Sequence, residues 1–320
     1  MNSNENFKNM NNRYSLKLRN FLSKTLSIIY NDQKIINKTI VLQDIINHLN
    51  AIVYLEIGVF DGSNFIKISA PKKIAVDPLI IFSKNFQQRF ASKNLYFEMT
   101  SEEFFNKKQN ILIKEGLDVV FIDGLHTYEQ SLKDILNSLT YLNENGVIVM
   151  HDCNPPHEAA AYPASSLEHA FSLNLPGWNG LWCGDVWKTI LHLRTTRKDL
   201  EIFVLNCDYG LGIISKGEQK NRLKNPLESI INYTYKDLKE NREKLLNLKH
   251  PKYYLDFFNI SRKKYRMLKK LRIKYSPTTP YEEVLILISR KIPENMRKML
   301  NRFIRYIISN KILVRLKKQI

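Results

Sequence analysis

The sequence predicts an α/β protein built on a doubly wound, mainly parallel sheet. Between residues 50 and about 215, short apolar runs alternate with longer stretches of helical periodicity. Such alternation is typical of parallel strands joined by right-handed crossover helices. Several runs, among them VVFI and VIVM, are apolar throughout, as expected of strands covered by helices on both faces.

Seven strands are expected, the first five of them parallel. The parallel strands are predicted at Ile52–Glu56, Lys73–Asp77, Leu95–Glu98, Asp118–Ile122 and Gly146–His151. The last two strands, Glu201–Asn206 and Gly210–Ser215, are separated by only three residues. Because that gap is too short for a crossover helix, these two should form an antiparallel hairpin.

Helices are expected between and around these strands. The clearest is Thr127–Leu142, where leucine and isoleucine recur at helical spacing. Others are predicted at Leu16–Tyr30, Val41–Leu49, Val186–Arg194 (with Asp185 as its N-cap) and Asn225–Leu248. The predicted organisation is a helical extension at 1–49, the α/β domain at 50–218, a helical segment at 219–259 and a basic tail at 260–320.

Composition limits the class of protein. Of the 320 residues, 44% are hydrophobic and 25% charged, so the chain can bury a large core and is neither disordered nor collagen-like. The three cysteines include no C-x-x-C pair, which argues against a disulfide framework or a structural zinc site. The first residues are polar, and no apolar run approaches ~18 residues. We therefore expect a cytoplasmic protein without a membrane-spanning helix.

Positive charge is concentrated in the basic tail. Residues 260–320 hold 18 Lys and Arg against three Glu, whereas residues 1–259 hold 31 against 28 acidic residues. Over Arg297–Lys318, apolar residues recur three or four apart between basic ones. This pattern predicts a cationic amphipathic helix, which we expect at an anionic membrane, on its inner surface. The alternatives are packing against the protein's own fold or within a homo-oligomer, and contacts with nucleic-acid phosphates, although no RNA-binding signature is present.

The first strand ends in a loop suited to a nucleoside. Its pattern is E-x-G-x-x-x-G, from Glu56 through Gly58 to Gly62, rather than the G-x-G-x-x-G of dinucleotide binders. The glycines allow close approach of the backbone, and the glutamate suits a ligand with a cationic end. Asp77 ends the second strand, where a carboxylate can accept hydrogen bonds from ribose hydroxyls. Glycines can also serve such a turn alone, but the combination favours a nucleoside cofactor.

In these residues the chain resembles the class I S-adenosylmethionine-dependent methyltransferases, over about residues 50–215. The resemblance implies a Rossmann-like, seven-stranded methyltransferase sheet with a terminal antiparallel hairpin, and S-adenosylmethionine as cofactor. The implied cofactor-binding residues are Glu56, Gly58 and Asp61 at the methionine end, with Gly62 in the same loop, Asp77 at the ribose, and Thr100 and Ser101 at the adenine.

Acidic and histidine side chains follow the fourth and fifth strands. Asp123 and His126 come after the fourth strand, and Asp152 after the fifth. Because adjacent parallel strands end at one edge of a sheet, the two carboxylates should converge beside the cofactor, where they can hold one Mg²⁺. His126 can then take a proton from an acceptor hydroxyl. The alternatives are a loop histidine bonded to backbone and an aspartate that caps a helix.

The D-G-x-H pattern resembles that of metal-dependent sugar O-methyltransferases of the macrocin and mycinamicin type and, more distantly, catechol O-methyltransferase. This implies that Asp123 is a catalytic metal ligand and His126 the general base. The acidic pair of the sugar enzymes corresponds to His151 and Asp152, so His replaces Glu. The Asn of the catechol enzymes is displaced to Asn154, and the implied Mg²⁺ ligands are Asp123, Asp152 and Asn154.

A long segment rich in Pro, Gly and aromatic residues, 155–187, follows the fifth strand, as lids and acceptor sites often do. Trp178, Trp182 and Trp187 can stack on the apolar face of a sugar, or can pack the segment onto the body. The sequence N-P-P-H at its start resembles the signature of adenine methyltransferases, but it follows the wrong strand and lacks the final aromatic residue.

These residues predict a methyltransferase that acts on a hydroxyl group. The predicted activity is S-adenosylmethionine-dependent, Mg²⁺-assisted O-methylation of a sugar, a glycan or another hydroxylated small molecule. Two alternatives stay open: a nucleic-acid methyltransferase that uses the basic tail, and a non-catalytic, membrane-associated module of the same fold.

Overall fold

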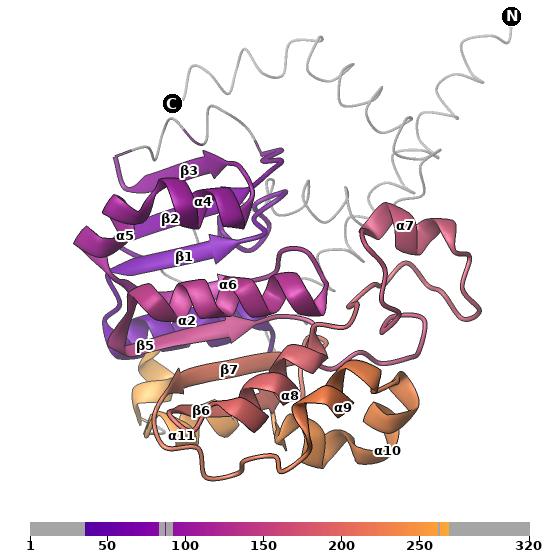
Figure 1. The fold of residues 1–320 in the computed structure, drawn as a ribbon. Helices are drawn as coiled ribbons and strands as arrows, with labels where there is room; N and C mark the ends of the chain where they lie inside the picture. Colours follow the sequence, from indigo (N-terminus) through magenta and orange to yellow (C-terminus); the bar gives the residue numbers. More distant parts are fainter. Residues whose placement is uncertain (1–35, 83–86, 88–91, 262, 269–320) are drawn as a thin grey trace, which may run out of the picture. The chain divides into compact units, whose positions relative to one another are not determined.

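One mixed sheet organises the chain. The computed structural model describes residues 36–82, 87, 92–261 and 263–268. Within them the strands form an eight-stranded sheet in the order β3-β2-β1-β4-β5-β7-β6-β8 (Figure 1). Their bounds are β1 Val53–Ile57, β2 Lys72–Asp77, β3 Asn94–Glu98, β4 Leu117–Ile122, β5 Leu142–Met150, β6 Leu200–Leu205, β7 Leu211–Lys216 and β8 Leu248–Lys249.

The strand directions confirm the predicted fold class. Strands β3, β2, β1, β4 and β5 are parallel, and β7 is antiparallel to both of its neighbours. All seven predicted strands are present, although β5 begins at Leu142, four residues before the prediction. The eighth strand, β8, has only two residues and pairs parallel to β6. Two residues carry no recognisable period, so the sequence could not reveal it.

Helices cover both faces of this sheet (Figure 1). They are α2 Lys38–Leu49, α4 Ser101–Lys107, α5 Gln109–Glu115, α6 Tyr128–Tyr141, α7 Leu167–Ser172, α8 Trp187–Thr196, α9 Leu227–Asn232, α10 Tyr235–Leu246 and α11 Tyr253–Phe257. Helices α4, α5, α6 and α8 lie on one face, and α2 and α11 on the other.

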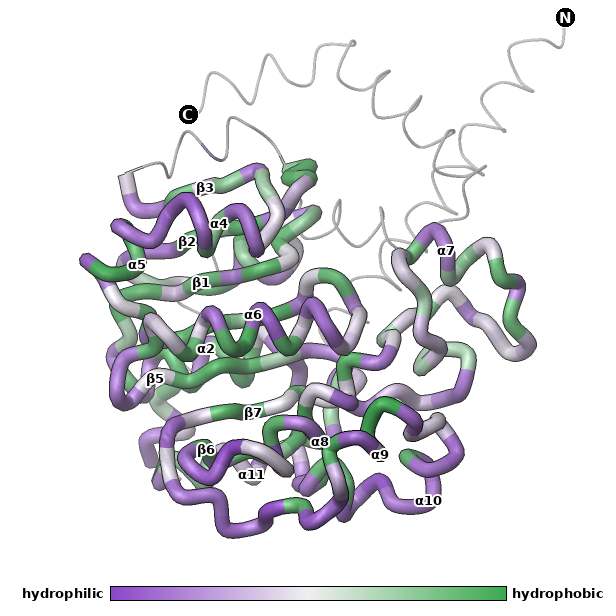
Figure 2. Tube along the Cα trace, viewed as in Figure 1, coloured by the Kyte–Doolittle hydropathy of each residue, from purple (hydrophilic) through white to green (hydrophobic). Residues whose placement is uncertain are grey.

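Alternate residues of the central strands enter two separate cores. In β1, Leu55 belongs to the core under α4, α5, α6 and α8, whereas Tyr54 belongs to the core under α2 and α11. In β4, Val120 and Phe121 divide in the same way. Figure 2 shows the central strands as mostly hydrophobic and α10 as largely hydrophilic. Burial on both faces explains the continuous apolar runs.

Two details of the predicted helices are corrected. The predicted helix Asn225–Leu248 is two helices, α9 and α10, because Thr234 and Asp237 form a capping box that starts α10. The carboxylate of Asp185 does not cap α8, whose N-cap is Val186. It accepts a hydrogen bond from the Tyr128 N–H of α6 instead, at 2.8 Å.

Other predictions fall largely outside the described residues. The predicted helix Leu16–Tyr30 and nearly all of the basic tail lie there, apart from residues 260, 261 and 263–268. In the part of the chain that the structure describes, no helix is long and apolar enough to cross a membrane.

Candidate active site

The register of the strands brings the predicted site residues to one edge. Ile57 of β1 pairs with Ile122 of β4, and Ile122 pairs with Met150 of β5. The next residues, Asp123 and His151, therefore leave the sheet side by side. Their N–H groups continue the ladder, donating to the carbonyls of Ile57 and Ile122 at 2.9 and 3.0 Å.

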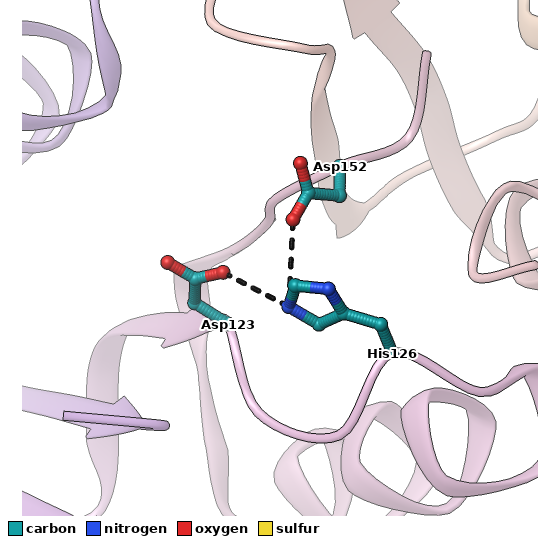
Figure 3. A group of neighbouring side chains, drawn as sticks. All are labelled: Asp123, His126 and Asp152. Atoms are coloured by element: carbon teal, nitrogen blue, oxygen red, sulfur yellow. Dashed lines mark ion pairs between the residues drawn. The ribbon is translucent and has the colours of Figure 1, made fainter. Parts of the chain in front are cut away.

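Asp123, His126 and Asp152 converge in one cluster (Figure 3). Nε2 of His126 lies 3.5 Å from Oδ1 of Asp123 and 3.4 Å from Oδ2 of Asp152. One donor atom from each residue lies within 4.8 Å of the other two. The convergence that the strand order predicts is therefore present, with the imidazole between two carboxylates.

The ring of His126 is oriented by the segment that follows β5. Its Nδ1 lies 2.7 Å from the carbonyl oxygen of Trp182, so Nδ1 carries the proton and Nε2 faces the carboxylates. The segment comes this close because residue 184 is glycine, at φ +61°: a Cβ there would lie 1.8 Å from the carbonyl oxygen of His126. Burial would lower the pKa of His126, but Asp152 and Asp123 raise it above its ordinary value.

His151 also belongs to this cluster, although the sequence predicted no role of its own for it. Its Nδ1 lies 3.1 Å from Oδ1 of Asp123 and 3.1 Å from Oδ2 of Asp152. Burial would lower the pKa of His151, but these two carboxylates raise it well above its ordinary value. In turn, burial would raise the pKa of Asp123, yet His151 and Lys38 hold it well below. The substitution of His for the expected Glu therefore changes the charge of the site.

Two further charged residues at the site were missed. Nζ of Lys38, at the start of α2, lies 2.6 Å from Oδ2 of Asp123. Asp208, in the β6–β7 loop, accepts the backbone N–H of Lys38 at 2.8 Å. Lys38 is 85 residues from Asp123 in sequence, and no local motif marks either residue as part of a site.

The predicted cofactor loop has a buried glutamate at its start. Glu56 accepts hydrogen bonds from the Tyr54 hydroxyl at 2.5 Å and from Nδ2 of Asn64 at 3.0 Å. Burial raises the pKa of Glu56 to about 7, with both hydrogen bonds acting in the opposite direction. A cationic ligand nearby would therefore favour the ionised form of Glu56.

Gly58 allows the ends of β1 and β4 to meet. It adopts φ +87°, and a Cβ there would lie 1.9 Å from the carbonyl oxygen of Asp123. Asp77, at the end of β2, accepts the N–H groups of Phe60 at 2.8 Å and Leu79 at 2.7 Å. It therefore shapes the loop after β1, and each of its oxygens has a second lone pair for a ligand.

The remaining predicted cofactor residues line the same edge but serve the backbone as well. Gly62 adopts φ +70°, and Asp61 accepts the N–H of Ser63 at 2.9 Å. Thr100 caps α4 through a capping box with Glu103. Ser101 is buried, and its hydroxyl accepts a hydrogen bond from Gln130 at 3.1 Å. Their roles toward a cofactor stay predictions.

The side chain of Asn154 forms its hydrogen bonds outside the cluster. Its Oδ1 accepts a hydrogen bond from Arg242, and its Nδ2 donates to Asn206 at 3.1 Å. The side chain is thus committed to α10 and the β6–β7 loop, which does not favour the predicted role as a metal ligand.

The three tryptophans have different surroundings. Trp187 is 1% exposed in the core under α8, which favours the packing alternative. Trp182 donates Nε1–H to the Tyr162 carbonyl at 2.9 Å and lies with its ring centroid 5.3 Å from that of His126. Trp178 packs edge-on against Phe171 of α7, at 5.4 Å. Only Trp182 lies against the cluster.

The donor set of the cluster fits a divalent cation. Asp123 and Asp152 present carboxylate oxygens, and His126 presents a nitrogen within the same 4.8 Å group. Oxygen ligands suit Mg²⁺, while an imidazole nitrogen also suits Mn²⁺ and Zn²⁺.

Part of this chain is similar to known proteins. Residues 55–153 match the family model described as a methyltransferase domain. An uncharacterized protein of Acanthamoeba polyphaga mimivirus is 27% identical over 113 residues, which cover 32% of this chain and 51% of that protein. The match thus spans about half the length of this curated relative.

Among solved structures, the chain is similar to the O-methyltransferase TomG from Streptomyces achromogenes in complex with SAM. That structure is 13% identical with a TM-score of 0.36, covering 56% of this chain and 79% of TomG. It is also similar to the MycE methyltransferase of the mycinamycin pathway in complex with Mg, SAH and mycinamycin VI. There the identity is 15% and the TM-score 0.33, with 53% and 46% of the chains covered.

The family match covers most of β1 and all of β2, β3, β4 and β5, and the cluster lies at the carboxyl ends of β4 and β5. The sheet places them in the order 3-2-1-4-5, followed by the antiparallel pair β7 and β6. The part of the chain that matches the methyltransferase-domain model therefore contains Asp123, His126 and Asp152.

Proposed function

We propose that this protein transfers a methyl group from S-adenosylmethionine to a hydroxyl of a sugar, a glycan or another hydroxylated small molecule. The observation that carries the proposal is the placement of His126. Its Nε2 lies 3.5 and 3.4 Å from two carboxylates at the edge where the cofactor loop ends. A histidine held in this way can accept the proton that a hydroxyl loses on methylation.

His126 acts as the general base in this proposal. Donation from Nδ1–H to the Trp182 carbonyl leaves the lone pair of Nε2 free for the acceptor proton. Once protonated, the imidazolium is stabilised by Asp123 and Asp152. Binding of the acceptor beside Nε2 aligns its oxygen for in-line attack, so positioning supplies much of the rate enhancement.

The cofactor loop suits S-adenosylmethionine in charge and shape. Glu56 offers a carboxylate of pKa about 7 to the cationic end of the molecule. Three exposed apolar side chains lie near Asp77 and can cover an adenine ring. They are Phe60, Leu79 and Ile81. When bound, S-adenosylmethionine supplies the electrophilic methyl group.

We also propose that Asp123 and Asp152 hold Mg²⁺. The convergence of their oxygens with His126 supports this proposal. A divalent cation there would polarise the acceptor hydroxyl as a Lewis acid. Because His126 serves as the base, the two carboxylates and water would be its ligands.

A methyl-transfer assay tests the function. The full chain is incubated with methyl-labelled S-adenosylmethionine and fractionated glycan, small-molecule and nucleic-acid extracts, with and without EDTA. We expect label in the glycan or small-molecule fraction, at least about 100-fold less for His126→Ala, and unchanged cofactor affinity. His250→Ala, at an exposed position far from the cluster in sequence, is the matched control.

Three outcomes contradict parts of this proposal. If label appeared only in nucleic acid, the acceptor would be a nucleic acid and not a sugar, a glycan or another small molecule. Full activity of His126→Ala would show that His126 is not the general base. Full activity in EDTA would show that the reaction needs no metal.

A further inference from the structure

The first turn of α2 contacts residues of the active site, although it lies outside the segment that matches the methyltransferase-domain model. Lys38 contacts Asp123 through its ammonium group and Asp208 through its backbone N–H. Thr39 donates its hydroxyl proton to Oδ1 of Asn64 at 2.8 Å. Asn64 in turn donates to Glu56 at 3.0 Å, so α2 is bonded to both halves of the site.

The ammonium of Lys38 is held in place among acidic groups. Its Nζ lies 2.6 Å from Oδ2 of Asp123, and both side chains are 16% exposed. It also lies 5.6 Å from the centre of the Phe121 ring. The lysine ammonium is therefore a fixed positive charge beside the Asp123 carboxylate.

The two oxygens of Asp123 have different partners. Oδ2 is bonded to Lys38, whereas Oδ1 faces His126 at 3.5 Å and His151 at 3.1 Å. A divalent cation at the cluster would therefore compete with Lys38 for Oδ2 and with the histidines for Oδ1, and it would be repelled by the nearby ammonium. At short range inside a protein, repulsion between like charges is large.

We propose that Lys38 is the resident cation of Asp123 and weakens the binding of divalent cations at this site. The inference concerns the metal dependence of the proposed methyltransferase and in that sense rests on the proposed function. Lys38 acts through Asp123 and is a positioning residue: it offsets the charge of this carboxylate and is bonded to Oδ2, so that Oδ1 faces the histidines.

The test is a titration of the full chain with Mn²⁺, followed by the electron paramagnetic resonance signal of free Mn²⁺, without cofactor or acceptor. Lys38→Met removes the charge and the hydrogen bond, and Lys38→Gln removes the charge but keeps a shorter, neutral hydrogen-bond donor. Both should bind Mn²⁺ at least about tenfold more tightly than the wild type. Lys38→Arg keeps the charge and should stay within about twofold of it.

Two controls assign the effect to this site. Lys72→Met removes a lysine that pairs with Glu115 at 2.7 Å at the start of β2, and it should leave Mn²⁺ binding unchanged. Adding Asp123→Asn to Lys38→Met should abolish the gain, because the carboxylate is then lost. Circular dichroism identifies any variant that does not fold, and Lys38→Gln is the milder change.

The inference is wrong if folded Lys38→Met or Lys38→Gln binds Mn²⁺ no more tightly than the wild type, or if the gain survives Asp123→Asn. Because the titration involves no turnover, it remains interpretable if the methyl-transfer assay fails. Tighter binding without any methyl transfer would support the role of Lys38 and reject the proposed reaction.

Discussion

Burial and neighbouring charges shift the pKa values of side chains at the carboxyl edge, so pH is the most informative variable at the scale of single residues. Glu56 has a pKa raised to about 7 by burial, and His126 has a pKa raised by Asp152 and Asp123 against the effect of burial. The two shifts act on different steps of the proposed reaction. In that reaction Glu56 would act on cofactor binding, and His126 on the acceptor.

Cofactor affinity should increase with pH through the titration of Glu56. The neutral acid predominates below pH 7, whereas a cationic ligand favours the carboxylate. If only the ionised form binds, affinity for S-adenosylmethionine rises about tenfold between pH 6 and pH 8. Isothermal titration calorimetry at both pH values measures this rise. Glu56→Gln should abolish it, whereas Glu144→Gln, at the opposite edge of the sheet, should retain it.

Methyl transfer should also increase with pH, because only neutral His126 can accept a proton. Asp152 makes the largest contribution that raises the pKa of His126. Asp152→Asn should therefore shift the ascending part of the kcat/KM profile to lower pH. Initial rates from pH 5.5 to pH 9 measure the shift. An unchanged profile would mean that His126 is not the group that titrates.

At the scale of elements, the site depends on how closely loops approach the ends of the strands. Gly58 allows β1 and β4 to meet, and Gly184 allows the segment after β5 to contact His126. In both places a Cβ would overlap a backbone carbonyl oxygen, which no side-chain rotation can relieve.

Gly58→Ala should therefore be much more damaging than a glycine substitution that meets no neighbour. Gly180 has nearly the same φ, +89° against +87°, but nothing lies within 4 Å of its Cβ position. Gly180→Ala should lower the free energy of unfolding by about 1 kcal/mol. Gly58→Ala should lower it by at least about 3 kcal/mol and abolish cofactor binding. Urea denaturation compares them, and equal losses would contradict the steric explanation.

At the scale of the whole molecule, charge is distributed very unevenly along the chain. The first 259 residues are almost neutral, and the basic tail carries nearly all of the excess positive charge. Membrane binding through this tail stays a prediction from the sequence.

Vesicle sedimentation tests that prediction. The full chain should bind vesicles that contain phosphatidylserine, but not neutral ones, and should dissociate at about 0.5 M salt. Replacing Lys298, Arg302, Arg305 and Lys311 with Gln should abolish binding. Replacing the exposed body lysines Lys107, Lys133, Lys236 and Lys239 should not. Equal binding to neutral vesicles would contradict the electrostatic basis.

Residue spacing predicted the strands well and the polar contacts poorly. Asp123 and Asp152 could be placed at one edge because each follows an apolar run, and parallel strands end together. The break between α9 and α10 was missed because the capping box at Thr234 lies inside an otherwise helical pattern. Asn154 follows a strand just as Asp152 does, yet Arg242 of α10 holds its side chain elsewhere.

The sequence by itself determined the fold class, the positions of seven strands and the edge of the sheet where the site lies, because apolar periodicity and loop length are local properties of the chain. Only the tertiary structure decided which charges share that edge. Lys38, His151 and Asp208 meet Asp123 or one another there from separate elements, and the contacts depend on packing between α2, β5 and the β6–β7 loop. No local pattern in the sequence predicts these contacts, because each of these residues is distant in sequence from at least one residue that it contacts.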